Sequence, residues 1–228
     1  MVARAFVEHY ASSGAVLLTP RDLSRKGWLF RMGDPESSVA IASGQRLAAR
    51  DIGGVMTRLP GIGPDELTHI AEEDRAYVAA EMTAFLLAFL SSLKVRVANR
   101  PTPLCLCGPC WRAEKWARLA NGLGIRVAPV RRRAVPGEDA APAPAGSVAT
   151  IVGTRFFGAV DPALAGTART LARTARADFL AVVFDGAGAE AALLGASPQV
   201  DLADADIAAA AFALFGQPGR RPEQAGPP

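Results

Sequence analysis

The sequence predicts an α/β protein with a parallel sheet in its N-terminal part and a small α+β C-terminal portion. Short apolar runs alternate with helical patterns, which is typical of a parallel α/β sheet. Residues 65–93 carry apolar side chains at spacings of three and four, which predicts a long amphipathic core helix. Residues 131–147 are rich in charge, Pro, Ala and Gly and have no apolar period, which indicates a flexible linker between the two parts.

The composition of the chain excludes several classes of protein. Of its 228 residues, 50% are hydrophobic and 21% are charged, which excludes an intrinsically disordered protein and leaves room for a sizeable core. The formal net charge is only +3, so we expect no nucleic-acid partner. The most apolar stretch, residues 78–93, is shorter than the roughly 20 residues that span a bilayer and contains Glu81. We therefore expect no membrane segment.

Two features predict a cytoplasmic protein. Glu8 and His9 interrupt the apolar run that a signal peptide would need. Cys105, Cys107 and Cys110 are clustered instead of being spread along the chain as a disulfide framework, which is typical of a reduced, intracellular protein.

The individual elements follow from the apolar runs and from the breakers between them. Before the linker we expect strands over 15–19, 38–42, 53–57, 95–98 and 125–130, helices over 65–93 and 111–121, a polar connection over 21–28 and a loop over 99–110. After the linker we expect strands over 148–152, 154–157, 179–184 and 189–194, and helices over 162–175 and 201–215. Glycines at 153, 186 and 188 predict hairpin turns.

The order of several motifs points to a known family. DIGGVMTRLP, the long helix, VRVANRP and WRAEKWARLANGLGIRVAP follow one another in the first half, with Arg58, Asn99 and Pro129 at the ends of strands. In the second half come VATIVGTRFFGA, TARTLARTARADFLAVVF and AEAALLGASPQ. Over residues 15–215 this order resembles the ATP-grasp amino-acid and peptide ligases. There one strand ends in Arg, another ends in Asn and a third reads gi-x-v-P, before a late strand pair, a final helix and the metal-binding strands.

The resemblance implies a division of the chain into four parts. They are a pre-ATP-grasp-like domain over 1–130, the linker over 131–147, an α+β remnant of the C-terminal ATP-grasp lobe over 148–215 and a disordered tail over 216–228. In the family, a much longer segment stands in place of the linker and builds the lysine-bearing lobe that clamps the triphosphate. We therefore expect that the nucleotide lobe is missing.

The resemblance also implies where magnesium would bind. The family takes its metal ligands from the acid of gvDf and from the Glu and Asn of lEvNp, and the matching positions here are Val183, Gly195 and Ser197. Phosphoryl transfer needs magnesium, and magnesium is usually held by carboxylates. Asp185 does not replace them, because a displacement along a strand changes the face or the depth of a side chain. We therefore expect no ATP, no magnesium and no catalytic residue.

Arg58 and the pair Asn99 and Arg100 are the candidate ligand-binding residues. Both positions follow predicted strands, so they would lie at the carboxyl edge of a parallel sheet, where open α/β folds bind ligands. A guanidinium there suits a carboxylate or a phosphate. The alternative for Arg58 is an ion pair with a surface acid such as Asp51 or Glu66.

Lys115 is a further candidate, because the resemblance implies a basic residue near this position of the ligases. A solvated helix face is the alternative explanation for this lysine.

The segment CLCGPC leaves three interpretations open. Cys107 and Cys110 have C-x-x-C spacing just before a predicted helix, whose N-terminus would lower the pKa of a thiol and favour redox activity. With Cys105 they could bind zinc or another thiolate-bound metal, although a closed site needs a fourth ligand and the only histidines are His9 and His69. The third interpretation is that small residues fill a loop. No Ser or Cys nucleophile with a His base is predicted.

The sequence thus leads to a hypothesis with two alternatives. We expect a non-catalytic, ATP-grasp-like accessory protein, or pseudoenzyme, of a biosynthetic or peptide-modification pathway. It would bind a protein or peptide partner near Arg58 and Asn99, or a carboxylate metabolite, and the partner could be a ligase or other pathway enzyme. The alternatives are an ATP-dependent carboxylate-amine ligase and a cysteine-cluster metal-binding or redox protein. Exposed sheet edges leave a homodimer open.

Overall fold

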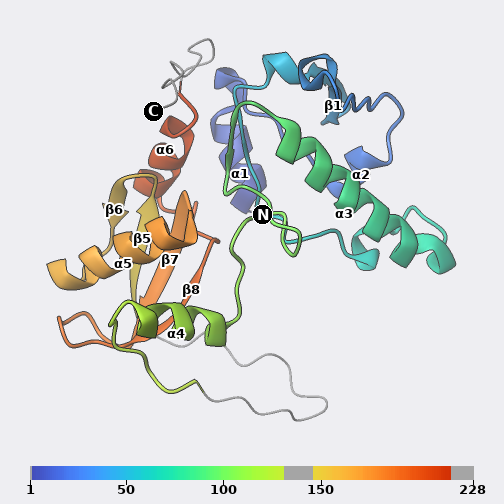
Figure 1. Ribbon diagram of the computed structural model, residues 1–228. Coiled ribbons are helices and arrows are strands. Elements are labelled where there is room, and N and C mark those ends of the chain that lie inside the picture. The colour runs from blue at the N-terminus through green and yellow to red at the C-terminus, as the bar shows by residue number, and fades with distance from the viewer. Residues whose placement is uncertain (1, 131–145, 217–228) are drawn as a thin grey trace.

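The computed structural model describes residues 2–130 and 146–216 and has the predicted α/β class. One half holds a sheet of four strands with α4, α5 and α6, and the other holds the long helix α3 with α2 and β1 (Figure 1). Within these residues, no helix is long and apolar enough to cross a membrane. The expected linker lies outside the described residues except for its last two, and the expected tail lies outside them except for Gly216.

The C-terminal half is built on an antiparallel sheet with the strand order β6-β5-β7-β8. The strands are β5 (Ser147–Val152), β6 (Arg155–Phe157), β7 (Phe179–Phe184) and β8 (Leu193–Ser197). The predicted turn at Gly153, with φ of 58°, joins β5 to β6. The strand predicted over 189–194 begins later, at Leu193, because Asp185 closes the preceding turn by accepting a hydrogen bond from the backbone N–H of Ala192 at 2.8 Å.

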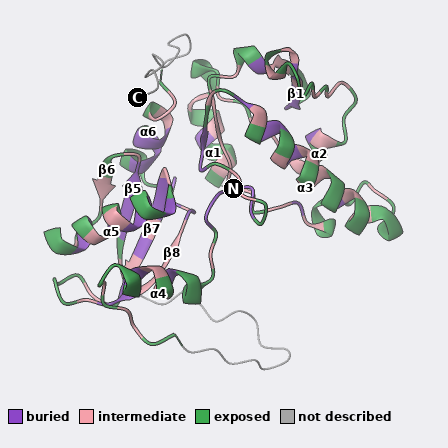
Figure 2. Cartoon of the chain, viewed as in Figure 1, coloured by how far each residue is buried: buried purple, intermediate pink, exposed green. Residues whose placement is uncertain are grey.

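Helices cover both faces of this sheet. On one face α5 (Pro162–Ala175) and α4 (Ala113–Gly122) pack on the sheet through a core that includes Trp116, Leu164, Leu171, Leu180, Val182, Phe184 and Leu193. On the other face, α6 (Ala205–Ala213) and α1 (Val2–His9) cover only the end near Phe179 and Val152. Figure 2 shows the buried residues gathered along β5, β7 and α6. Among the described residues, fewer side chains therefore cover the far end of this second face.

The N-terminal half contains the predicted parallel pair. Strand β3 (Gly54–Met56) pairs in parallel with β4 (Arg96–Ala98), and α3 (Arg75–Ser92) forms the crossover between them. A separate antiparallel hairpin consists of β1 (Val39–Ala42) and β2 (Gln45–Ala48). Among the described residues no other pair of strands is parallel, and the larger sheet is antiparallel, although residues 125–130 add one isolated parallel bridge to β8.

Several predicted boundaries were wrong for physical reasons. Residues 15–19 form no strand, because an apolar run does not by itself supply a pairing partner. The helix predicted over 65–93 begins only at Arg75, after the 3₁₀ turns Pro64–Glu66 and Glu72–Asp74. The strand predicted over 125–130 makes a single parallel bridge, from Val127 to Leu193. The short helix α2 (Pro20–Leu23), together with α1 and β2, was not predicted.

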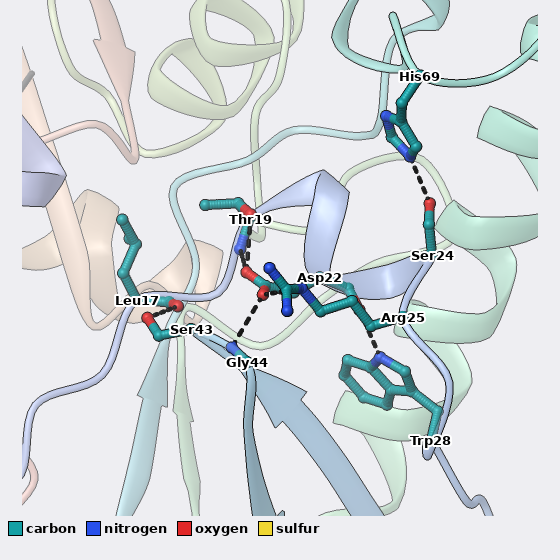
Figure 3. Close-up of polar contacts among 9 residues, drawn as sticks. All are labelled: Leu17, Thr19, Asp22, Ser24, Arg25, Trp28, Ser43, Gly44 and His69. Atoms are coloured by element: carbon teal, nitrogen blue, oxygen red, sulfur yellow. Dashed lines mark hydrogen bonds and ion pairs between the residues drawn. The ribbon is translucent and has the colours of Figure 1, made fainter.

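A buried carboxylate fixes residues 15–23 against the hairpin (Figure 3). Asp22 accepts hydrogen bonds from the N–H and hydroxyl of Thr19 at 3.0 and 2.7 Å and from the N–H of Gly44 at 3.3 Å. The Nε of Arg25 lies 3.5 Å from the same carboxylate. The hydroxyl of Ser43 also donates to the carbonyl of Leu17 at 2.9 Å. These donors supply the partners that a buried charge requires, so the segment is anchored without strand pairing.

Asn99 joins the two halves of the molecule. Its side chain is only 1% exposed, and its Nδ2 donates to the carbonyl of Phe179 at 2.9 Å. The N–H of Phe179 donates in return to Oδ1 of Asn99 at 2.8 Å. The amide of Asn99 thus pairs with the first residue of β7 as another strand would, directly after β4 ends. We call this pair of hydrogen bonds the Asn99 clamp.

The clamp predicts a large effect of the substitution Asn99→Ala. Removing the amide leaves a buried N–H and a buried C=O of Phe179 without partners, at a cost of roughly 2–4 kcal/mol in the free energy of unfolding. Chemical denaturation of the purified chain measures this loss. Asn121→Ala, at an exposed position of α4, is the matched control and should change stability by less than about 0.5 kcal/mol. Equal losses in the two variants would contradict the role of the clamp.

Candidate functional site

The three positions that the resemblance assigns to metal ligands lie on one face of the sheet. Val183 and Gly195 are direct cross-strand partners, and Ser197 pairs with Ala181 two residues further along, so both pairs point to the same face. A Cβ added at Gly195 would meet no atom within 4 Å, and Val148, the other partner of Val183, is 45% exposed. This is the sparsely covered end of the second face. Its side chains offer a surface for contact, but they bring no carboxylate to the matched positions.

Arg58 and Gln199 form a second connection between the halves, next to this face. Nη1 of Arg58 donates to the carbonyl of Val200 at 2.8 Å, and Nε2 of Gln199 donates to the carbonyl of Arg58 at 2.9 Å. Burial lowers the pKa of the Arg58 guanidinium, and the nearby charge of Asp201 offsets part of this effect. The guanidinium of Arg58, which follows β3, is thus fixed against the backbone of the segment that follows β8.

The alternative ion pairs of Arg58 are not formed. Asp51 lies beside Arg50, with 3.9 Å between the Arg50 Nε and the carboxylate. Glu66 instead accepts a hydrogen bond from the N–H of Gly63 at 2.9 Å. A role of Arg58 in binding a ligand stays a prediction.

The three cysteines converge beside Arg58. Their Sγ atoms all lie within 4.8 Å of one another, and those of Cys105 and Cys107 are 3.4 Å apart. Cys105 and Cys107 are buried, whereas Cys110 is exposed. Nε2 of Gln199 lies 3.4 Å from Sγ of Cys107 and donates to it. We call Cys105, Cys107 and Cys110 the thiol cluster.

The loop that carries the thiol cluster is held by the N-terminal half. The N–H of Leu106 donates to the carbonyl of Pro60, and the hydroxyl of Thr57 donates to the carbonyl of Leu106, both at 2.8 Å. Gly108 has φ of 86°, and a Cβ there would lie 2.4 Å from the Cβ of Asn99. Only glycine fits this close approach, so the loop and the Asn99 clamp depend on each other.

The electrostatics of the thiol cluster differ from the expectation for a redox C-x-x-C pair. Burial, with further contributions from Cys105 and Cys110, raises the pKa of the Cys107 thiol to about 12. Burial also raises the pKa of Cys110. Helix α4 begins only at Ala113, beyond the last cysteine. The predicted lowering of the thiol pKa is therefore wrong for Cys107 and Cys110.

Arg100 and Lys115 lie apart from the thiol cluster's immediate contacts. Nη1 of Arg100 donates to the carbonyl of Ser91 at 3.5 Å. Burial raises the pKa of the Asp178 carboxyl, and the charges of Arg96 and Arg100 offset part of this rise.

Nζ of Lys115 lies 3.9 Å from the centroid of the Trp111 ring. That packing refines the solvated-face interpretation, because the ammonium is exposed and also makes a cation–π contact.

Lys115 belongs to a group of exposed cations that the sequence analysis did not assemble. With Arg112, Glu114 and Arg118 it lines a shallow pocket of about 350 Å³ at the beginning of α4. We call Arg112, Lys115 and Arg118 the α4 basic patch. The helical spacing of three residues could have predicted it, and the positive end of the helix dipole adds to its charge.

The structure also brings together a serine and a histidine. Oγ of Ser24 and Nε2 of His69 are 2.7 Å apart, although 45 residues separate them in the chain (Figure 3). The sequence analysis did not predict this contact, and its expectation of no serine nucleophile with a histidine base stays a prediction. Both side chains are exposed, and among the described residues no carboxylate is bonded to His69 to orient its ring. The pair fastens α2 to the turn after Leu67.

Comparisons with known proteins bear on the fold. No protein-family model matches the sequence, and no curated protein is similar to it. The structure is similar to the crystal structure of the macrocyclase MdnB from Microcystis aeruginosa MRC, with a TM-score of 0.63 and 16% sequence identity. The likeness covers 94% of this chain and 95% of that one. At this identity it shows the fold, and it confirms that both halves belong to one α/β architecture.

The burial of the thiols predicts an order of reactivity. In the reduced chain at pH 8, a brief pulse of iodoacetamide should label Cys110 before Cys107. A thiol with a pKa of about 12 has a thiolate fraction on the order of 10⁻⁴ at this pH, and Cys107 is also shielded from the reagent. Peptide mass mapping measures the labelling at each site. After unfolding in guanidinium both should react equally, and equal rates in the native chain would contradict the prediction.

Proposed function

We propose that this protein is a non-catalytic accessory subunit of a peptide-modification pathway, which binds an acidic peptide on a scaffold shaped like that of a macrocyclase. The observation that carries the proposal is the pairing of Val183 with Gly195 on an accessible sheet face. The ligase resemblance assigns metal ligands to this face, yet neither residue has a side-chain oxygen.

The fold supports the choice of pathway. A macrocyclase closes a ring in its substrate, and the likeness to such an enzyme extends over nearly all of both chains. A scaffold of this kind suits a protein that holds the same class of substrate. The absence of carboxylates from Val183, Gly195 and Ser197 supports a role in holding substrate, because magnesium-dependent phosphoryl transfer needs such ligands.

The α4 basic patch supports the choice of an acidic peptide. Arg112, Lys115 and Arg118 are all exposed and line one shallow pocket together with the single acid Glu114, so the lining keeps a positive net charge. Arginine and lysine side chains bind carboxylates through charge-assisted hydrogen bonds. Helix α4 packs against β8, so a peptide on the patch would lie beside an edge of the sheet. We extend the predicted binding region near Arg58 to include this patch. Asn99 is not part of the proposed region, because its amide is bonded to the backbone of Phe179.

The first test concerns nucleotide. Millimolar magnesium-ATP should leave the thermal unfolding midpoint of the purified chain unchanged. Bound nucleotide at about 100 times its Kd would add roughly 2.7 kcal/mol of stability and raise the midpoint visibly. Differential scanning calorimetry with and without magnesium-ATP makes the measurement, and magnesium chloride alone is the control. A clear upward shift would contradict the proposal and would favour the alternative of an ATP-dependent carboxylate-amine ligase.

The second test concerns the peptide. A fluorescein-labelled decapeptide with four glutamates should bind the chain, and the same peptide with glutamines should bind more weakly. The double substitution Lys115→Ala and Arg118→Ala should raise the Kd roughly tenfold, because each exposed ion pair contributes about 0.2–1 kcal/mol. Added salt should weaken binding by screening these charges. Fluorescence anisotropy measures the affinities.

A matched control keeps this test specific. The substitutions Arg169→Ala and Arg173→Ala remove the same charge from exposed positions of α5 and should leave the Kd within about twofold of the original. An equal loss in both double variants would show that only net charge matters. Equal binding of the two peptides would also contradict recognition by the α4 basic patch.

A further inference from the structure

We propose that the thiol cluster binds a thiophilic divalent metal ion, with Zn²⁺ the first candidate, through three thiolates and one exchangeable position. This inference does not depend on the proposed function. It rests on the geometry of the CLCGPC loop and on the groups that surround it.

The spacing of the sulfur atoms is close to that of a metal site. The three Sγ atoms lie within 4.8 Å of one another, and the pair from Cys105 and Cys107 is 3.4 Å apart. A Zn–S bond of about 2.3 Å in tetrahedral geometry places sulfurs about 3.8 Å from one another. Small side-chain rotations would therefore suffice. A set of thiolates selects soft or borderline ions such as Zn²⁺ and disfavours Mg²⁺.

The loop holds this arrangement through contacts that involve no cysteine side chain. Leu106 lies between Cys105 and Cys107. Its carbonyl accepts a hydrogen bond from the hydroxyl of Thr57, and its N–H donates one to the carbonyl of Pro60. Gly108 is packed against Asn99. Because the backbone is fixed in this way, a metal would order little further structure on binding.

The surroundings favour a negatively charged metal centre. One Zn²⁺ and three thiolates carry a net charge of −1. Gln199 donates to Sγ of Cys107, and its amide is itself held by the carbonyl of Arg58. The guanidinium of Arg58 is close enough for its charge to interact with Cys107. Such outer contacts orient the ligands and tune metal affinity.

The binding step releases protons. Each cysteine that binds as a thiolate loses its S–H proton, so the three Zn–S bonds form as three S–H bonds break and three protons pass to solvent. No oxidant or reductant takes part.

Within residues 2–130 and 146–216, no fourth His, Cys, Asp or Glu joins the cluster. His69 is bonded to Ser24, and His9 lies against Tyr10. Among the described residues no protein group takes the fourth position, and in this proposal water or a ligand from solution fills it.

Filling of a loop by small residues is the competing explanation. It accounts for Cys105 and Cys107, which are buried. It gives no reason for a third thiol at the exposed Cys110 to converge on the other two.

The experiment titrates Co²⁺ and then Zn²⁺ into the reduced, chelator-treated full chain. We expect one Co²⁺ per chain, with sulfur-to-cobalt charge-transfer absorption that Zn²⁺ abolishes and visible bands that shift when a small thiol fills the fourth position. Calorimetry in two buffers of different ionisation enthalpy should give about three protons released per Zn²⁺. Cys107→Ser and Cys110→Ser should each lose the complex, and the second changes an exposed side chain, so we expect it to leave the fold intact.

Two further variants test the outer contact. Gln199→Ala should weaken Zn²⁺ binding roughly 10- to 100-fold, whereas Gln45→Ala, at an exposed position of β2, should not change it. Absence of the charge-transfer band in the reduced chain would overturn the proposal. So would an unchanged band in the Cys107→Ser, Cys110→Ser double variant.

Discussion

The Asn99 clamp is the interaction on which the rest of the structure depends. Strand β4 is only three residues long and ends directly before Asn99, and β7 begins at Phe179, to which the clamp is bonded. A side-chain amide takes the place of a further strand residue at this point, because it supplies one donor and one acceptor in the same plane. The small parallel pair of the N-terminal half is thereby joined to the larger antiparallel sheet.

The candidate site is a consequence of this junction. Gly108 packs on Asn99, so the loop that carries the thiol cluster is fixed relative to β7. Gln199, just beyond β8, reaches back to both Arg58 and Cys107. From Cys110 the chain runs directly into Trp111 and the α4 basic patch. The thiol cluster is therefore tied to the chain just beyond β8 and is followed directly along the chain by the exposed cations of α4.

The sequence predicted those helices and strands whose ends are marked by nearby residues such as proline or by an uninterrupted apolar run. The helix over 162–175 and the strand over 179–184 have the predicted bounds, since Pro162 and the apolar run of β7 mark them. The strand predicted over 15–19 is absent because strand formation also needs a pairing partner, and this apolar run has no strand beside it. For the site, the C-x-x-C spacing located the cysteines, whereas Gln199 and the Ser24–His69 pair arise only from contacts across the fold.

Native-state hydrogen exchange at the amide of Phe179 tests the account most directly. If the clamp holds the two halves as one cooperative unit, this amide should exchange only through global unfolding, with the same free energy and denaturant dependence as the buried amides of Leu180 and Val182 in the β7 core. Exchange of the Phe179 amide at a much lower free energy, while those core amides stay protected, would show that the halves separate locally. That result would contradict the account.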